Sequence, residues 1–242
     1  MANGQRDAQR WLEISPERIT VWLASFAERH GATATEVDDR REVVTVRAAD
    51  GSSAACYTPF PPLSVSAMGS GGDLAAHAGA DRTVAVLLVR LGGYAAGVFA
   101  GAPPRLVASK VGSRLVHGRS AAGGTSQHRF ARRREKQARE ALEAAADNAV
   151  GVFAAFSGRL DAVVLGGDKR SMAPLRADAR LRPYFDLAVD RFLTVPDPRL
   201  AVLKDTPRLF RAIRIRLTDS RSGGAGAAET AETGSPDGSA VT

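Results

Sequence analysis

The sequence predicts an α/β (α+β) protein in which helices pack on a mixed sheet, behind a small N-terminal α+β unit. Three observations lead to this prediction. Short β-rich runs separated by turn residues fill 34–57, and a strand-rich segment followed by alternating helices and strands fills 83–217. The chain has 242 residues, of which 44% are hydrophobic and 24% charged, which is enough to bury a core without cross-links.

The N-terminal unit is expected to span 1–58. Ser15 can cap a helix over 15–30, Pro16 suits its first position, and Gly31 ends it. The apolar stripe of this helix consists of Ile19, Trp22, Leu23 and Phe26. Alternating runs at 34–37, 43–47 and 54–57 predict an antiparallel meander. The following segment, 59–80, contains Pro-Pro and Gly-Ser-Gly-Gly and has little periodicity, so we expect a flexible linker.

The larger unit is expected to span 81–218. Strands are predicted at 83–91, 94–100 and 105–111, followed by a helix from 127 to about 156 that would be roughly 45 Å long. The rest of the unit is predicted as a strand at 160–165, a helix at 172–181, a strand at either 185–189 or 191–195, a helix at 198–204 and an edge strand at 213–217. The tail, 219–242, has a net charge of −3 and no large apolar residue, so disorder is expected there.

Positive charge is concentrated in one part of the chain. The formal net charge is +7, but residues 105–140 alone hold ten Lys and Arg against two Glu, a local charge of +8. This concentration favours a polyphosphate partner, RNA or DNA. The single cysteine, Cys56, and the lack of a long apolar run predict a cytoplasmic protein without a membrane span.

Metal and nucleotide chemistry find little support in the sequence. The four histidines, His30, His77, His117 and His128, lack the spacing of a zinc site, and we expect no metal and no cofactor. The run from Gly166 to Ser171 has a glycine pair before a lysine, but it lacks the upstream glycine of a phosphate-binding loop. An ordinary strand-to-helix turn is the favoured interpretation.

The most informative segment is 118–135, where a glycine-rich stretch leads into a cationic helix. Paired glycines let the backbone approach a ligand closely, and arginines after them can bind phosphates. The residues alone leave two interpretations open. Either the glycine-rich tip takes part in chemistry, or it is a turn capped by Ser126 in front of a solvated basic helix that binds RNA passively.

A resemblance to a known family bears on this choice. The stretch Gly-Gly-Thr-Ser-Gln-His-Arg-Phe-Ala-Arg, 123–132, resembles the middle domain of eukaryotic and archaeal class-1 release factors, whose pattern is GGQ, Ser, two variable residues and Arg-Phe-Ala-Arg. Thr125 stands at the glutamine position, and Gln127 follows two residues later. That variation is similar to the VLRF family, the Vms-like release factors, in its actinobacterial type. The similarity covers about 81–219.

The resemblance implies a codon-independent peptidyl-tRNA hydrolase that acts on stalled large ribosomal subunits in ribosome-associated quality control. Its partners would be 23S-type rRNA at the peptidyl-transferase centre and peptidyl-tRNA, and the protein is expected to be monomeric. Gln127 would orient water, while backbone amides of Thr125 and Ser126, held by the bend at Gly123 and Gly124, would stabilise the developing charge. The residues expected to contact RNA are Arg119, Arg129, Arg132, Arg133, Arg134, Lys136, His117 and His128.

Two other functions remain as alternatives. The same basic helix could belong to a non-catalytic ribosome or rRNA-binding factor that inserts its tip and only blocks the site. A nuclease is the weaker alternative, because the sequence shows no carboxylate cluster suited to two metal ions.

Overall fold

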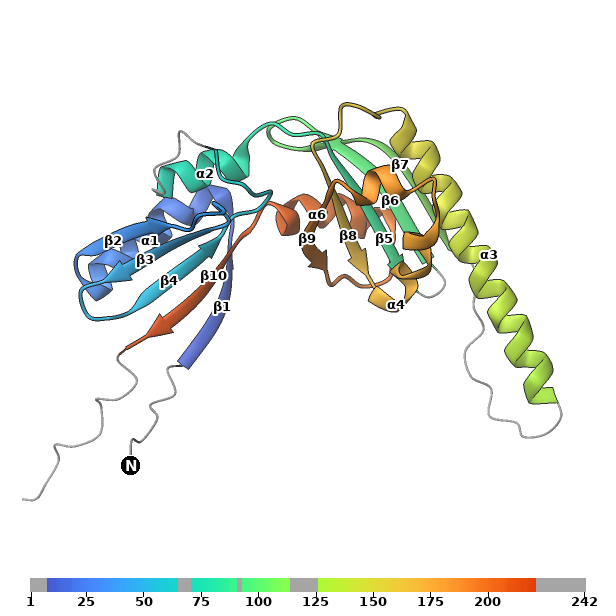
Figure 1. Cartoon of the computed structure of the whole chain (residues 1–242), viewed down its shortest axis with the longest axis horizontal. Helices are drawn as coiled ribbons and strands as arrows, with labels where there is room; N and C mark the ends of the chain where they lie inside the picture. Colours follow the sequence, from blue (N-terminus) through green and yellow to red (C-terminus); the bar gives the residue numbers. More distant parts are fainter. Residues whose placement is uncertain (1–7, 65–70, 91–92, 114–125, 221–242) are drawn as a thin grey trace, which may run out of the picture.

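A computed structural model describes residues 8–64, 71–90, 93–113 and 126–220, and for 126–134 we use the backbone alone. Figure 1 shows two units, each built on its own sheet, with a long helix extending from the second. The elements are β1 (Ala8–Ile14), α1 (Pro16–His30), β2 (Thr33–Val37), β3 (Val43–Ala48), β4 (Ser53–Tyr57), α2 (Gly71–Gly79), β5 (Val84–Arg90), β6 (Gly93–Ala100), β7 (Arg105–Ser113), α3 (Ser126–Ala154), β8 (Ala162–Gly167), α4 (Lys169–Met172), η1 (Pro174–Ala177), α5 (Arg182–Phe185), β9 (Ala188–Leu193), α6 (Leu200–Phe210) and β10 (Ile213–Asp219).

The first sheet is antiparallel, with the strand order β1-β10-β4-β3-β2. Helices α1 and α2 pack on one of its faces, where Phe26 of α1 and Leu74 of α2 are fully buried. Side chains alternate between the two faces along each strand. In β10 this alternation buries Ile215 and exposes Arg214 and Arg216.

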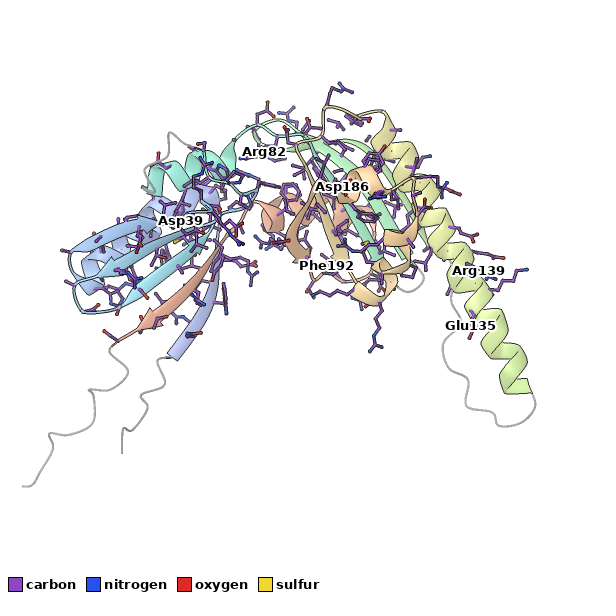
Figure 2. The ribbon with its side chains drawn as sticks, in the orientation of Figure 1. Asp39, Arg82, Glu135, Arg139, Asp186 and Phe192 are labelled. Carbon is purple, nitrogen blue, oxygen red and sulfur yellow. The ribbon has the colours of Figure 1, made fainter. Side chains whose placement is uncertain are left out.

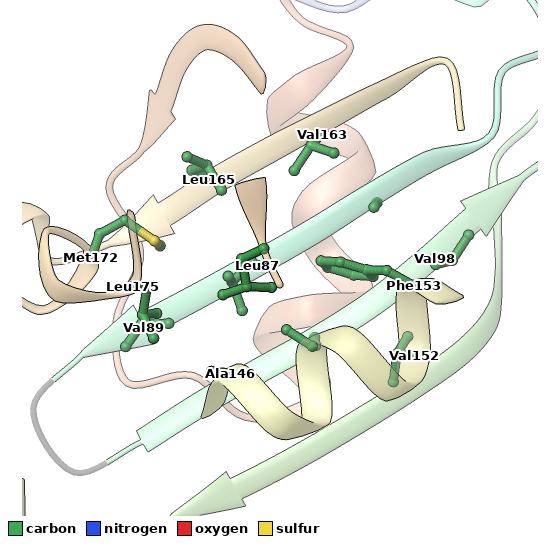
Figure 3. Close-up of a cluster of buried hydrophobic side chains, with 14 residues drawn as sticks. Leu87, Val89, Val98, Ala146, Val152, Phe153, Val163, Leu165, Met172 and Leu175 are labelled. Atoms are coloured by element: carbon green, nitrogen blue, oxygen red, sulfur yellow. The ribbon is translucent and has the colours of Figure 1, made fainter. Parts of the chain in front are cut away.

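The second sheet is mixed, with the strand order β7-β6-β5-β8-β9. Strands β5, β8 and β9 run parallel, whereas β5, β6 and β7 pair antiparallel. One face carries α3 and the short helices that follow β8, and Figure 3 shows Phe153 of α3 and Met172 of α4 in that core. The other face carries α6, through Leu203 and Phe210. The predicted fold class is therefore confirmed.

The last strand lies in a different sheet from the one expected. Residues 213–217 were predicted as an edge strand of the larger unit, but β10 lies inside the first sheet, between β1 and β4. The predicted boundaries of 1–58 and 81–218 do not match this arrangement, since the first unit needs β10 to join β1 to β4. Alternation along a strand reveals that one face is buried, but it does not reveal which sheet the strand joins.

Part of the expected linker at 59–80 packs in the cores of both sheets. Phe60 lies against Phe210 with ring centroids 5.8 Å apart, in the core beneath the second sheet. Leu63 and Leu74 are buried in the first core, and 71–79 forms α2. These few apolar side chains anchor a segment whose composition is otherwise typical of a linker. Residues 65–70 lie outside the described part.

The region after β8 is more broken than predicted. The expected helix at 172–181 is replaced by α4, the 3-10 helix η1 and α5, with Pro174 and Pro183 at the starts of the latter two. Proline fits the first turn of a helix but interrupts a continuous one. Strand β9 overlaps both alternatives given for this region, and α6 extends past 204 to Phe210. The tail beyond 220 lies outside the described residues.

Within the described residues, no helix is both long and apolar enough to cross a membrane.

Candidate functional site

Helix α3 has a packed C-terminal part and an exposed N-terminal part. Ala145, Ala149 and Phe153 are at most 1% exposed, and Ala149 and Phe153 lie in the core of the second sheet. Nearer the N-terminus, Glu135 and Arg139 are exposed, and Figure 2 shows them on the part of the helix that extends beyond the sheet. Among the residues of α3 from Glu135 onward, whose side chains the structure describes, Ala145 is the first that is buried, and it lies 19 residues after Ser126. At 1.5 Å per residue, the helix start lies about 28 Å beyond that point.

Polar contacts fix the packed part of α3 to the sheet. Asn148 Nδ2 donates a hydrogen bond to the Tyr94 hydroxyl of β6 at 2.8 Å and another to the Ala144 carbonyl at 2.7 Å. The Tyr94 ring in turn crosses Gly112 of β7, where a Cβ atom would overlap the ring and hydroxyl of Tyr94. Glycine at 112 therefore permits the contact that joins β6, β7 and α3. The strand leading into 114–125 and the helix leaving it share this anchor.

The structure places only some of the predicted catalytic residues. Ser126 and Gln127 form the first turn of α3, so Gln127 stands at the outer end of the extending helix. Gly123, Gly124 and Thr125 lie outside the described residues. The amides of a first helical turn have no partner within the helix, and the helix dipole is positive at that end. This end is therefore suited to bind a negative charge.

Most of the predicted RNA-binding residues lie on α3. His117 and Arg119 lie outside the described residues, whereas His128, Arg129, Arg132, Arg133 and Arg134 lie on the backbone of α3. The Lys136 side chain is 70% exposed, with its Nζ 3.9 Å from a Glu140 carboxylate oxygen. Residues 126–140 contain six Lys and Arg against two Glu, a charge of +4. The N-terminal part of α3, residues 126–140, therefore carries a net positive charge.

The glycine pair at the end of β8, Gly166 and Gly167, has a structural role. Asp168 caps α4 by accepting hydrogen bonds from the Arg170 amide at 3.1 Å and the Ser171 hydroxyl at 3.0 Å, and these bonds lower its pKa. Gly167 has a φ of +103°, and a Cβ atom there would strike the backbone of Val89. The favoured interpretation, a strand-to-helix turn, is confirmed.

Two histidines and the cysteine also serve the fold. His30 Nδ1 lies 2.9 Å from an Asp50 carboxylate oxygen, and buried His77 lies 3.0 Å from the Pro59 and Phe60 carbonyls through Nε2. Burial lowers the pKa of His77 and raises the pKa of the Cys56 thiol to about 12. In the part of the chain that the structure describes, no three His, Cys, Asp or Glu side chains gather as metal ligands would.

Sequence reasoning missed two other features. A cavity of about 380 Å³ lies beside β9, lined in part by Lys169, Arg176 and Phe192. A group of exposed aromatic and arginine side chains, centred on Trp11, lies on the first sheet. Neither has a local sequence signature. The cavity is formed by several short elements between residues 165 and 192, and the aromatic group is formed by segments far apart in the chain.

A family comparison places the chain in a class of translation release factors. The chain belongs to the Actinobacteria/chloroflexi VLRF1 release factor family, whose model matches residues 82–216, more than half of the chain. The match spans the second sheet, α3 and the greater part of β10. The resemblance that the sequence predicted is confirmed. Release factors act in translation at the ribosome and in general promote ester hydrolysis.

Solved structures show weaker similarity. The archaeal translation termination factor aRF1 matches with a TM-score of 0.41 and 13% identity, over 53% of this chain and 36% of that one. A second match, described as an archaeal protein, has a TM-score of 0.34 and 13% identity, over 83% of this chain and 65% of that one. This chain thus spans about a third of the length of the archaeal termination factor. No curated protein matches it.

Proposed function

We propose that this protein hydrolyses the ester bond between a nascent peptide and transfer RNA on stalled large ribosomal subunits, without reading a codon. Membership of the release factor family and the Gly-Gly-Thr-Ser-Gln sequence at 123–127 both support the proposal. The observation that carries it is the position of Gln127, at the outer end of a cationic helix that begins about 28 Å beyond the buried Ala145. Such a helix can enter an RNA-walled channel while its base stays in the fold.

The proposed chemistry uses neutral groups. The Gln127 amide cannot remove a proton at neutral pH, so its role is to orient the attacking water by accepting and donating hydrogen bonds. The amides of the first turn of α3, which have no acceptor within the helix, together with that of Thr125, donate to the developing oxyanion or the leaving 3′ oxygen. One well-placed donor of this kind contributes about 10² to 10³ in rate. Ribosomal RNA and transfer RNA supply the remaining contacts.

The arginines of the exposed part of α3 have a positioning role in this proposal. Arg129, Arg133 and Lys136 follow a spacing of four and three residues, which places them along one side of the helix. Contacts from these cations to RNA phosphates make binding sensitive to salt and independent of sequence. The VLRF pattern supports rescue of stalled subunits, in ribosome-associated quality control, over normal termination.

The test is a peptide-release assay on purified large subunits that carry labelled peptidyl-tRNA. Gln127→Ala should lower the single-turnover release rate at least about 100-fold while leaving subunit binding, measured by co-sedimentation, nearly unchanged. Gln137→Ala is the matched control, because it removes the same side chain from the same helix ten residues away. Equal losses of release and binding in Gln127→Ala would remove Gln127 from the chemistry.

The alternatives give different results in the same assay. Wild-type protein that binds the subunits and liberates no peptide would establish a non-catalytic blocking factor. Cleavage of RNA that stops when a chelator is added would establish a metal-dependent nuclease. The proposal requires release of intact peptide with the RNA left uncleaved.

A further inference from the structure

The first sheet has one covered and one open face. Helices α1 and α2 bury the face that carries Ile213, Ile215 and Leu217 of β10. The opposite face carries Arg214 and Arg216, both exposed, and Trp11 of β1, which is 48% exposed. An exposed tryptophan in the middle of a strand leaves a large flat apolar surface in contact with water.

Aromatic rings and guanidinium groups alternate on this open face. Strand β10 pairs with β1 on one side and β4 on the other, so that Arg214 stands opposite Tyr57, and Arg216 opposite Trp11. The Trp11 and Tyr57 rings lie 5.3 Å apart, across β10. Arg214 Cζ lies 4.7 Å from the centre of the Trp11 ring, and Arg216 Cζ lies 6.0 Å from that of Tyr57. We call these four side chains the aromatic-arginine face.

The two arginines are available to a ligand. Two acidic side chains of this face already have cationic partners, since Glu13 lies 2.8 Å from Arg191 and Glu36 lies 3.8 Å from Arg47. Among the described residues, neither Arg214 nor Arg216 forms an ion pair with a carboxylate. Positive charge beside flat apolar rings is complementary to a ligand that has flat rings and negative charge.

We propose that the aromatic-arginine face binds single-stranded RNA, with a base stacked on Trp11 or Tyr57 and adjacent phosphates bound by Arg214 and Arg216. Unpaired bases stack on aromatic side chains of open sheets, and arginine contributes both phosphate contacts and cation–π stacking. A duplex hides its base faces, and an acidic peptide has the charge but few flat rings. This second RNA site lies on a different unit from Gln127 and does not depend on the proposed hydrolysis.

The first experiment uses Trp11 itself as the reporter in the full-length chain. The protein has two tryptophans, so Trp22→Phe leaves Trp11 as the single source of tryptophan fluorescence. Addition of a ten-nucleotide oligouridine should quench this emission in a saturable way, because a base stacked on the indole changes its environment. Unchanged emission at RNA concentrations that saturate binding would overturn the proposal. Emission that responds to phosphatidylglycerol vesicles and not to RNA would assign the face to a membrane surface and would also overturn it.

The second experiment measures affinity by fluorescence anisotropy of the labelled oligouridine. The N-terminal part of α3 is also proposed to bind RNA, so all variants carry Arg132→Ala, Arg133→Ala and Arg134→Ala. In this background Trp11→Ala should weaken binding about 5- to 100-fold, whereas Trp11→Phe, which keeps a ring, should stay within about threefold. Equal affinities for Trp11→Ala and its parent, or equal losses with duplex RNA of the same length, would overturn the proposal.

The arginines have their own prediction. Removing Arg214 and Arg216 together should reduce the slope of log K against log salt by about 1.4, the value expected for two phosphate contacts to a single strand. The matched control is Arg208→Ala, an exposed arginine of α6 that pairs with Asp205. An unchanged slope for the double variant would remove the two arginines from the proposed site.

Discussion

Shortening α3 without changing its charge tests whether its reach matters. Deletion of 135–141 removes two Glu, one Lys and one Arg, so the net charge is unchanged, and each removed residue is exposed or half-buried. Seven residues shorten the helix by about 10 Å and rotate its start by only about 20°, because 3.6 residues make one turn. Gln127 therefore keeps nearly the same direction but is withdrawn by about a third of its 28 Å reach.

The expected result is a loss of peptide release of at least about 100-fold, since misplacement by even 1 Å can cost that much. The assay is single-turnover release from large subunits carrying labelled peptidyl-tRNA, with unfolding by urea as the check on stability. Replacement of the same seven residues by seven alanines restores the length and should recover release to within about tenfold of wild type, the remaining loss reflecting Lys136. Release at the wild-type rate by the shortened protein would refute the role of an extended helix.

The remaining predictions concern stability. Gly166→Ala should lower the free energy of unfolding by about 1–3 kcal/mol, because its Cβ would lie 2.8 Å from the Leu193 carbonyl oxygen. Gly151→Ala should raise it by up to about 1 kcal/mol, since Gly151 lies in α3 with nothing within 4 Å of its Cβ position. Urea titrations that rank the two variants the other way would contradict the packing described. The hydrogen bonds from the Ser52 amide and His30 lower the pKa of Asp50 from 3.8 to about 2. Its stabilising effect is therefore present above pH 3.8 and is lost as the pH falls through about 2. The difference in Tm between wild type and Asp50→Asn should shrink over that range, and a constant difference would contradict it.

The elements with strong local patterns could be predicted from the sequence. Strand β5 is a nearly unbroken run of Val and Leu because it is buried on both faces, between α3 and α6. Helix α3 was expected from residue 127 and begins at Ser126, because its apolar stripe repeats with helical spacing over its packed part.

Elements defined by distant partners could not be predicted. Strand β1 has no regular alternation of polar and apolar residues, and it is a strand because all seven of its residues pair with β10, about 200 positions later. The same limit applied to α2, whose Leu74 is buried only because α1 and the first sheet surround it. The local composition of a segment does not indicate which distant segment it will pack against.

In the candidate site, too, contiguous motifs could be predicted and contacts between distant residues could not. The Gly-Gly-Thr-Ser-Gln run and the arginines after it are contiguous, so their pattern could be recognised directly. The anchor that holds α3 in place joins Tyr94, Gly112 and Asn148, and the hydrogen bond between the first and last of these spans 54 residues. Each of them looks unremarkable in its own segment. The aromatic-arginine face was missed for the same reason.

The position of β10 has a consequence for biosynthesis. The first sheet needs a strand from the far end of the chain, so the whole second sheet is an insertion between β4 and β10. During translation the second sheet leaves the ribosome complete while the first sheet still lacks its internal strand β10. The first sheet therefore forms last, after residue 219 has left the exit tunnel. Until then, β1 and β4 lack the strand that pairs with both of them. A factor proposed to rescue interrupted translation would thus itself be especially sensitive to truncation near its C-terminus.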